Sequence, residues 1–456
     1  MGGSGDHRWI PLARSRMNAY LSWGRYPKVT PAAIYRAHWT DEPLPSGSHS
    51  LLPYGNGRSY GDSCLNDGGA LLDMRGLDRM LGFDRSTGVL RCEAGVLLAD
   101  ILSLVVPMGW FLPVTPGTRF VTVGGAIAND VHGKNHHRTG TFGQHVLRLA
   151  LRRSDRGIVL CSPIENAELF HATIGGLGLT GAILWAEIRL RLIANPGVDS
   201  ETIRFANLDA FFDLSEESDR DYEYTVAWID CLAHGKSLGR GLFMRGNHAS
   251  PQERLPPPPR RTRTFPVDLP FPLVNAWSLR AFNSLYYRKQ MALMRRNITH
   301  YEPFFYPLDG ILHWNRLYGR RGFLQYQCVV PPDSAKESIR TLLEAIAVAK
   351  GGSFLAVLKV FGNRCSPGLL SFPRPGATLA LDFPNQGQRT LDLLDQLDKI
   401  VASAGGAVYP AKDARMSGEH FRQYFPRWEE FQRHIDPRFS SSFWRRVTGS
   451  STCATS

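Results

Sequence analysis

Two glycine-rich segments constrain the fold of this chain more than any other feature. The first, GNGRSYGD, spans Gly55–Asp62, and the second, PGTRFVTVGGAIANDVHGKNHH, spans Pro116–His137. Glycines let successive backbone N–H groups point into one concavity, where they bind a diphosphate without obstruction from side chains. Neither segment has the G-x-G-x-x-G spacing between strand and helix that is typical of nicotinamide-dinucleotide sites. The pair therefore favours a diphosphate-containing cofactor that is held in another way.

The second segment opens a predicted helix and continues into a polar run. Thr122, Gly124 and Gly125 precede small residues, which leaves the start of the helix free of bulky side chains. Such a helix start offers free N–H groups and the positive end of a dipole to a diphosphate. A tight core turn would explain the glycines but not the polar residues that follow, which are Asn129, Asp130, His132, Lys134 and Asn135. We therefore expect a binding site here.

Short apolar runs and glycine-rich turns organise the chain from Leu51 to Leu192 into an α+β region. Strands are predicted at Gly69–Met74, Gly88–Gly95 and Leu179–Leu192, and helices at Leu97–Gly109 and Ala167–Gly176. A polar break near Asn195–Ser200 marks the predicted end of this first domain.

The second part of the chain has a different order of elements. Tyr222–Asp230 is predicted to be a strand, and a long irregular stretch is expected after it. Further strands are predicted at Phe323–Pro331, Phe354–Gly362 and Ala377–Pro384, and helices at Ser334–Lys350 and Arg389–Gly405. This order indicates a small antiparallel sheet that two helices cover on one face, as in a substrate domain. The aromatic and basic tail from Tyr409 onward is expected to fold back onto the first domain.

The charge balance favours an anionic partner. Lys and Arg number 53 against 41 Asp and Glu, a net charge of +12, which suits a phosphorylated substrate or an acidic membrane surface. The densest basic run, Arg260–Arg263, adjoins four prolines, so we expect no nucleic-acid groove. The stretch Pro251–Pro272 leaves two interpretations open: a solvated polyproline linker, or a mobile basic lid that meets phosphate or lipid head groups.

Cysteine usage and hydropathy favour a cytoplasmic protein without a metal site. The seven cysteines are scattered and include no C-x-x-C pair, which fits reduced thiols. The N-terminal residues lack the apolar core of a signal peptide. The longest apolar run, Ile101–Val114, is interrupted by Pro107 and Gly109, so we expect no transmembrane helix.

The two glycine-rich segments, in this order and together with Ala167–Ile183, resemble the FAD-binding domain of the vanillyl-alcohol-oxidase-type flavoproteins. Within that group the chain is most similar to the decaprenylphosphoryl-β-D-ribose 2′-oxidase family, through Pro116–His137, Phe323–Gln327, Leu358–Gly362, Leu381–Pro384 and Tyr409–Arg415. The resemblance runs from about Leu51 to Pro437. It implies an α+β fold in which a two-part FAD-binding domain, residues 1–195 with a returning segment 406–456, carries an inserted antiparallel-sheet substrate domain, residues 196–405.

The resemblance also implies which residues bind the cofactor. The matching positions are Gly55, Asn56, Gly57, Arg58, Ser59, Tyr60, Gly61, Asp62, Ser63, Gly117, Thr122, Val123, Gly124, Gly125, Asn129, Asp130, Val131, His132, Ile183 and Tyr409. Many relatives tether the flavin covalently through a histidine in the first glycine-rich segment, and Arg58 occupies that position here. We therefore expect FAD to be bound non-covalently.

The family's sugar pocket maps onto Tyr60, His132, Lys134, Trp228, Gln325, Gln327, Lys359 and Lys412. Oxidation of a C2 hydroxyl requires its proton to leave as hydride moves to the flavin. Lys412 is expected to stabilise the negative charge that develops on the flavin, and His132 or a lysine to orient the hydroxyl or accept its proton. Trp228 is assigned to the pocket wall by the resemblance alone, since tryptophans usually lie in a core.

Two of these positions also make sense from their strands alone. Gln325 and Gln327 lie two residues apart, so both amides should face the same side and read neighbouring hydroxyls. Lys359 interrupts an apolar strand, and a lysine there needs an anionic partner or a polar cavity. Three positions depart from the family pattern: Ala380 replaces a pocket cysteine, Thr378 replaces an asparagine and Phe305 replaces a tyrosine.

The resemblance implies oxidation of the C2 hydroxyl of a polyprenylphosphoryl pentose to a 2-keto sugar. This is the first half of a 2′-epimerisation that supplies an arabinose donor for the cell envelope, with a separate NAD-dependent keto-reductase as partner and peripheral contact with the inner membrane face. A second hypothesis is a flavin oxidase or dehydrogenase of a soluble sugar, aldonolactone or alditol. A third is a flavin-binding or nucleic-acid-associated protein that has lost the chemistry, against which His132, Lys134 and Lys412 argue.

Overall fold

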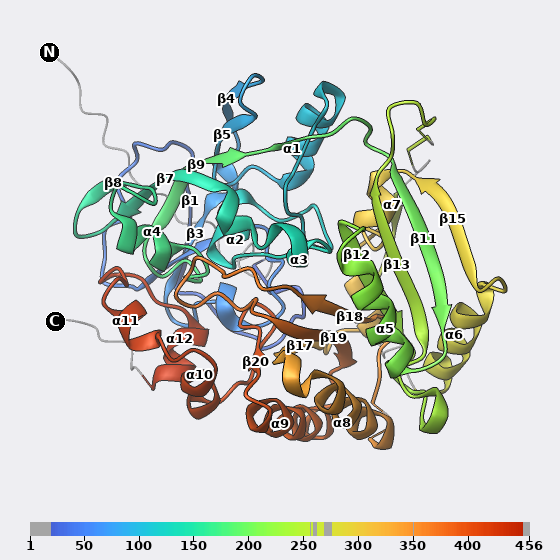
Figure 1. Ribbon diagram of the computed structural model, residues 1–456. Coiled ribbons are helices and arrows are strands. Elements are labelled where there is room, and N and C mark those ends of the chain that lie inside the picture. The colour runs from blue at the N-terminus through green and yellow to red at the C-terminus, as the bar shows by residue number, and fades with distance from the viewer. Residues whose placement is uncertain (1–19, 256, 259–261, 269–275, 350, 450–456) are drawn as a thin grey trace, which may run out of the picture.

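The computed structural model describes residues 20–255, 257–258, 262–268, 276–349 and 351–449. The two interpretations of Pro251–Pro272 therefore fall partly outside the described residues. Figure 1 shows two parts side by side, one built from the first half of the chain and the other around a long antiparallel sheet. None of the helices in the described ranges is long and apolar enough to cross a membrane.

Among the described residues, the first part contains two larger sheets and a two-stranded antiparallel sheet of β6 and β10. A parallel sheet has the order β1-β3-β2, and an antiparallel sheet has the order β4-β5-β9-β7-β8. The strands are β1 Ala33–Arg36, β2 Leu51–Tyr54, β3 Ala70–Asp73, β4 Met80–Asp84, β5 Val89–Glu93, β6 Trp110–Phe111, β7 Val146–Arg153, β8 Gly157–Cys161, β9 Ala182–Arg189 and β10 Arg191–Leu192. The helices are α1 Leu98–Val105, α2 Val123–Ala128, α3 His136–Thr139 and α4 Ala167–Thr173.

The second part is built on an eight-stranded sheet of order β15-β11-β13-β12-β18-β19-β17-β20. Its strands are β11 Val198–Phe205, β12 Tyr224–Ile229, β13 Gly241–His248, β15 Met294–Thr299, β17 Phe323–Val330, β18 Ala356–Phe361, β19 Gly376–Pro384 and β20 Ala407–Val408; β14 Arg263–Thr264 pairs with β16 Ile311–Leu312 outside it. The helices are α5 Leu208–Asp219, α6 Ala276–Lys289, α7 Tyr301–Phe305, α8 Ala335–Val348 and α9 Gln388–Ser403.

This sheet is larger than the sequence predicted, and the expectation of a long irregular stretch after Asp230 was wrong. Gly241–His248 forms β13, which pairs with β11 along eight residues. The edge strand β15 carries mainly exposed polar side chains, so its sequence lacks the alternation of apolar residues that would indicate a strand. Its position depends on long-range pairing with β11, which local sequence patterns do not encode.

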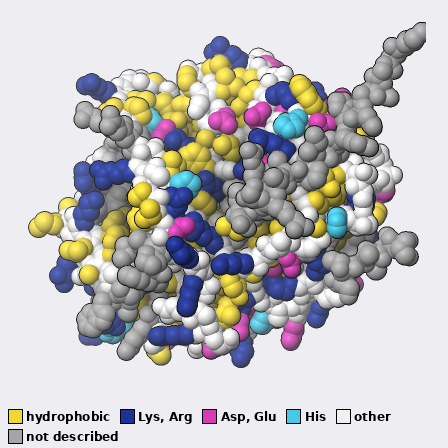
Figure 2. Space-filling model, turned by 180° about the vertical axis from the view of Figure 1, so that it is seen from behind, with side chains coloured by type: hydrophobic (Ala, Val, Ile, Leu, Met, Phe, Trp, Pro, Cys, Tyr) yellow, Lys and Arg dark blue, Asp and Glu magenta, His cyan; other side chains and the backbone are white. Residues whose placement is uncertain are grey.

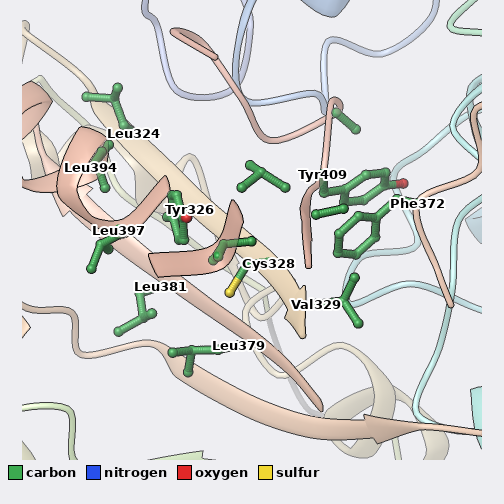
Figure 3. Close-up of a cluster of buried hydrophobic side chains, with 14 of the residues drawn as sticks. Leu324, Tyr326, Cys328, Val329, Phe372, Leu379, Leu381, Leu394, Leu397 and Tyr409 are labelled. Atoms are coloured by element: carbon green, nitrogen blue, oxygen red, sulfur yellow. The ribbon is translucent and has the colours of Figure 1, made fainter. Parts of the chain in front are cut away.

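The predicted helices near 334–350 and 389–405 are confirmed as α8 and α9, and both pack on one face of the sheet (Figure 1). Figure 3 shows the core they form, which contains Leu324, Tyr326 and Cys328 of β17, Leu379 and Leu381 of β19, and Leu394 and Leu397 of α9. Side chains alternate across a strand. The intervening residues of β17 therefore face the opposite side of the sheet, toward the first part.

The C-terminal segment joins the two parts. After β20, the helices α10 Gly418–Tyr424, α11 Trp428–Gln432 and α12 Ser442–Thr448 lie beside the first part (Figure 1). Arg446 of α12 makes ion pairs with Asp62 at 2.7 Å and with Asp413 at 2.9 Å. One guanidinium thus connects the end of the chain to both the first glycine-rich segment and the loop after β20.

Candidate active site

One large cavity lies where both glycine-rich segments, the open face of the long sheet and the loop after β20 meet. Most of the residues expected from sequence line it: Gly55, Asn56, Gly57, Arg58, Ser59, Tyr60, Ser63, Gly117, Thr122, Gly124, Gly125, Asn129, Val131, His132, Ile183, Gln325, Gln327, Lys359, Tyr409 and Lys412. The expected residues that do not line it are Gly61, Asp62, Val123, Asp130, Lys134 and Trp228.

The first glycine-rich segment presents unused hydrogen-bond donors to this cavity. The backbone N–H groups of residues 56–59 donate to no acceptor in the described part of the chain. Gly57 has a φ of +59°, and a Cβ there would collide with the Tyr54 hydroxyl, so the turn requires glycine. The Ser63 Oγ is buried and has no partner among the described residues. These donors fit a diphosphate, because buried polar groups without a partner are costly.

The N-terminus of α2 is different from what the sequence suggested. The N–H groups of Val123, Gly124 and Gly125 donate to Val96 O at 2.9 Å, Ala94 O at 2.8 Å and Thr122 Oγ1 at 3.1 Å. The expectation of free donors at this helix start was therefore wrong. A Cβ on Gly124 would lie 3.1 Å from the Ala94 Cβ, so the glycine allows α2 to pack closely on the preceding strand segment. This packing leaves room for a ligand above the helix.

A second set of unused donors lies in the loop before α2. The N–H groups of Gly117 and Thr118 have no acceptor within the described ranges, and both residues line the cavity. A Cβ on Gly117 would meet no atom within 4 Å. Two loops, 56–59 and 117–118, thus offer the cavity unused donors of the kind that a diphosphate needs.

Lys412 is a partly buried cation on the cavity wall. Its Nζ lies 3.9 Å from the centre of the Tyr60 ring and makes no hydrogen bond or ion pair with any described residue. The pKa of Lys412 is lowered to about 7, chiefly by burial; the Asp382 carboxyl opposes this effect and nearby Lys359 adds to it. An ammonium in such a poorly solvated position favours an anionic or electron-rich ligand.

Asp382 is fully buried against the cavity-lining residue Gln325, and the sequence reasoning missed it. The Gln325 Nε2 donates to its Oδ1 at 2.6 Å, and its Oδ2 is buried without a partner in the described part of the molecule. Burial raises the pKa of Asp382 to about 7, an effect that Lys412 opposes. The strand register pairs Asp382 directly with Gln325. Because side chains alternate along a strand, the LDFP motif could have placed this carboxyl on the cavity side of the sheet. The hydrogen bond to Asp382 engages the Gln325 amide, which the sequence analysis expected to bind a substrate hydroxyl.

His132 is a neutral imidazole that packs against aromatic rings and has one side-chain hydrogen bond within the described residues. Its Nε2 lies 2.9 Å from the Gln327 Nε2, so the amide donates to the ring, and its Nδ1 has no partner among the described residues. Burial, with Lys359 adding to it, keeps the pKa of His132 well below its ordinary value. A substrate hydroxyl that uses this Nε2 as an acceptor would have to replace the Gln327 amide.

The other two expected lysines differ from each other in position. Lys359 lines the cavity and donates from Nζ to Gly133 O at 3.2 Å, and burial lowers its pKa to about 8. Lys134 lies outside the cavity, where its Nζ donates to Phe304 O and sits 4.4 Å from the Phe304 ring centre. Burial lowers the pKa of Lys134 to about 7. Lys134 thus supports the wall behind the site.

Trp228 also lies behind the wall. Its Nε1 donates to Phe354 O at 2.9 Å, and its ring packs edge-on against Tyr286 at 4.7 Å. The next residue after Phe354, Leu355, lines the cavity. Trp228 therefore holds the strand segment that carries the lining residue.

The remaining expected cofactor residues hold the loops in place. Asp62 is paired with Arg446, and Asp130 accepts hydrogen bonds from Ser371 Oγ at 2.6 Å and from Gly143 N at 2.9 Å. Tyr409 donates from its hydroxyl to Asn129 O at 2.7 Å and stacks on Phe372. The contact between Tyr409 and Asn129 fixes the loop after β20 against the second glycine-rich segment.

The three departures from the family pattern have different surroundings. Thr378 and Ala380 line the cavity, and the Thr378 hydroxyl accepts a hydrogen bond from Gln327 at 3.3 Å. Phe305 is buried among aromatic rings, including Phe111 at 5.3 Å and Tyr224 at 4.8 Å. The first two positions can affect substrate choice directly, whereas Phe305 belongs to the core.

Comparisons with known proteins agree with this geometry. Residues 46–162 match the model of the FAD binding domain family. The chain is 36% identical over 446 residues to decaprenylphosphoryl-β-D-ribose oxidase of Mycolicibacterium smegmatis, covering 92% of this chain and 93% of that protein. It is 34% identical to an uncharacterised Streptomyces coelicolor protein over 77% of this chain and all of that protein. It is 33% identical to mouse L-gulonolactone oxidase over 28% of this chain and 29% of that protein.

Three observations support one assignment: the match to the FAD binding domain family, the unused donors of the two loops, and the similarity to a relative over nearly its full length. The chain belongs to the decaprenylphosphoryl-β-D-ribose oxidase family of vanillyl-alcohol-oxidase-type flavoproteins, and it is an FAD-dependent oxidoreductase that acts on CH–OH groups.

Proposed function

We propose that this enzyme oxidises the C2 hydroxyl of a polyprenylphosphoryl pentose to the 2-keto sugar. The observation that carries the proposal is the juxtaposition of Lys412, Lys359 and His132 on the walls of one cavity that also holds the cofactor loops. Two partly buried lysines suit an anionic substrate, and a neutral imidazole suits a hydroxyl. The name of the Mycolicibacterium smegmatis relative, an oxidase of decaprenylphosphoryl ribose, supports this substrate class.

The proposed mechanism assigns a separate task to each side chain. The donors of loops 56–59 and 117–118 would hold FAD, which would supply the hydride acceptor when bound. Lys412 stabilises the negative charge that accompanies hydride transfer, because its ammonium already lies at the cavity wall, over the Tyr60 ring, before the reaction begins. His132 orients the C2 hydroxyl at Nε2 and accepts its proton there after the Gln327 amide is displaced. Lys359 pairs with the phosphate of the substrate.

The affinity for the phosphorylated substrate is expected to fall as pH rises through about 7 to 8. Burial lowers the pKa of Lys412 to about 7 and that of Lys359 to about 8. An anion binds best to the protonated lysines, so above these values binding must first take up protons. The Kd should rise by roughly tenfold per pH unit for each lysine that must be reprotonated. Titration by flavin fluorescence measures this, and Lys359→Met should flatten the upper part of the profile.

The flavin is expected to leave the protein completely on denaturation. Arg58 occupies the position of the tethering histidine, and its guanidinium lies 4.1 Å from the centre of the Trp23 ring. Cys64 also lines the cavity, but burial raises the pKa of its thiol to about 12, so the nucleophilic thiolate is scarce. Acid precipitation should leave all flavin in the supernatant. A coloured pellet after washing would contradict the proposal.

We also propose the place of this reaction in a two-step sequence. A separate NAD-dependent keto-reductase would reduce the 2-keto product and complete a 2′-epimerisation that yields an arabinose donor for the cell envelope. The enzyme would work from the cytoplasm, in peripheral contact with the inner membrane face. Within the chain we propose residues 1–195 and 406–456 as the FAD-binding domain and residues 196–405 as the substrate-binding domain.

Anaerobic mixing with candidate substrates tests the proposal directly. The oxidised, FAD-loaded protein is mixed with a polyprenylphosphoryl ribose, with its dephosphorylated sugar and with free pentitols. Bleaching of the flavin by the phosphorylated lipid alone is the expected result. Bleaching by free pentitols or aldonolactones at comparable rates would favour the alternative, an oxidase of soluble sugars.

A further inference from the structure

Helix α6 and the strand that follows it expose an unusual number of apolar side chains. Five of the fifteen exposed large hydrophobic side chains in the described residues lie within this short segment: Phe282, Leu285, Met291, Leu293 and Met294. Their exposed fractions run from 42% to 86%. Single exposed leucines are ordinary, but a contiguous group of them marks an interaction site. We call the exposed side chains between residues 280 and 296 the α6–β15 surface.

The same surface is basic. No acidic residue occurs between Asp268 and Glu302, whereas Arg280, Arg288, Lys289, Arg295 and Arg296 all lie in that interval and are exposed. Arg296 is paired with Asp199 at 2.5 Å. The other four make no ion pair with any described residue. Figure 2, turned so that α6 and β15 lie toward the left, shows hydrophobic side chains projecting between Lys and Arg side chains along that edge.

Helix α6 has a buried inner face and an exposed outer face. Leu279 and Asn283 are buried, and the Asn283 Nδ2 donates to Asp230 Oδ1 at 2.9 Å. The outer face carries Leu285, Arg288 and Lys289. A helix that is anchored on one side and presents apolar and cationic side chains on the other is suited to the interface between lipid head groups and acyl chains.

An aromatic cluster connects this surface to the active-site cavity. Phe282 stacks on Tyr286 with ring centres 5.7 Å apart and packs edge-on against Phe354 at 5.9 Å. The neighbouring Leu355 and Val357 line the cavity. A lipid chain that leaves the cavity by this wall would meet aromatic rings and then the exposed apolar side chains of α6. This path for the lipid chain rests on the proposed polyprenyl substrate. The description of the α6–β15 surface does not depend on it.

We propose that the α6–β15 surface docks the protein on an anionic lipid bilayer. The four unpaired cations are complementary to acidic head groups, and the leucines and methionines between them can enter the acyl region. A second copy of the chain is a poor occupant, because the surface is cationic and the whole chain carries a net charge of +12. The same orientation would deliver a membrane-bound substrate to the cavity wall.

Vesicle co-sedimentation of the full-length FAD-loaded protein tests the docking without any substrate. Vesicles of phosphatidylcholine are compared with vesicles of equal parts phosphatidylcholine and phosphatidylglycerol. We expect binding to the anionic vesicles that added salt weakens. Arg288→Gln combined with Lys289→Gln should lower partitioning roughly 25-fold, since each cation near an acidic surface contributes about fivefold. Leu285→Ser combined with Leu293→Ser should also weaken binding.

Matched controls use exposed side chains elsewhere on the molecule. The variant Arg364→Gln with Lys399→Gln removes two exposed cations that lie outside the α6–β15 surface. The variant Ile158→Ser with Ile164→Ser removes two exposed apolar side chains that also lie outside it. Both control proteins should bind vesicles like wild type. All variants are first required to retain flavin and an unchanged melting temperature. Equal binding by the α6–β15 variants and their controls, or no binding by wild type, would overturn the proposal.

Two further measurements separate this proposal from the others. Loss of a dimer in the α6–β15 variants, seen by size-exclusion chromatography, would assign the surface to self-association and overturn membrane docking. A short-chain, water-soluble phosphoryl pentose should reduce the flavin equally fast in wild type and in Arg288→Gln with Lys289→Gln. If vesicle binding follows the expectation while no phosphoryl pentose bleaches the flavin, the docking surface stands and the proposed substrate fails.

Discussion

Lys412→Ala protein is expected to retain FAD and to lose most of its flavin reduction by substrate. The Lys412 Nζ lies at the cavity wall, unpaired among the described residues and 3.9 Å from the Tyr60 ring centre, so its removal takes away the cation at that point. Loss of one preorganised group that stabilises developing charge typically slows the chemical step by about 10²–10³-fold. Anaerobic stopped-flow mixing with a phosphoryl pentose measures the rate.

Two comparisons make this result specific to the ammonium. Lys412→Met keeps most of the side-chain volume and should be as slow as Lys412→Ala, which excludes a cavity effect. Lys399→Ala removes an exposed lysine on α9 and should react like wild type. The flavin content of each protein is measured before mixing. A normal reduction rate in Lys412→Ala would remove this residue from the catalytic role.

Gly117→Val protein is expected to fold but to bind FAD much more weakly. Gly117 lines the cavity, its N–H has no acceptor within the described residues, and a Cβ there would meet no protein atom within 4 Å. The valine side chain would therefore occupy space that the cofactor needs rather than space in a core. Overpacking costs roughly 1–3 kcal/mol, which corresponds to a Kd about 5- to 150-fold higher. Titration of the apoprotein with FAD measures the change.

Gly82→Val is the matched control for this substitution. Gly82 lies on the exposed strand β4, a Cβ there would also meet no atom within 4 Å, and neither glycine has a positive φ. The two proteins share the same change in backbone entropy and β-branching, so only the location differs. Equal FAD affinity of the two variants, or aggregation of Gly117→Val alone before cofactor is added, would refute the assignment of loop 117–118 to the cofactor.

The sequence predicted those parts of the molecule that local patterns encode. Helices α8 and α9 each show a helical apolar periodicity, and β17 shows the pattern of a strand, all within a single short segment of sequence. These three elements could therefore be located from the sequence. The edge strand β15 is exposed and polar, and its pairing partner β11 lies about a hundred residues earlier in the chain. Strands of this kind are defined by their neighbours. The eight-stranded sheet could therefore not be read from its separate strands.

The site shows the same division. Glycine positions indicated where backbone donors would face a ligand, and residues 56–59 match that expectation. The N–H groups at the start of α2 donate to acceptors on Ala94, Val96 and Thr122 instead of a ligand. The sequence does not show that a neighbouring segment would supply these acceptors. Asp382 was missed because its importance depends on the Gln325 amide across the sheet and on burial of its second oxygen. Both properties arise only when three strands come together.

Lys412 is the last cavity-lining residue along the sequence and Arg446 follows it, an order that has a consequence for biosynthesis. Translation proceeds from the N-terminus at roughly 5–20 residues per second, and the glycine-rich loops emerge long before the segment that closes the cavity over them. The clamp from Arg446 to Asp62 and Asp413 can form only after residue 446 has been synthesised, later than every residue that lines the cavity. We therefore expect a chain cut short before Arg446 to hold the first glycine-rich segment less firmly than the protein that contains it.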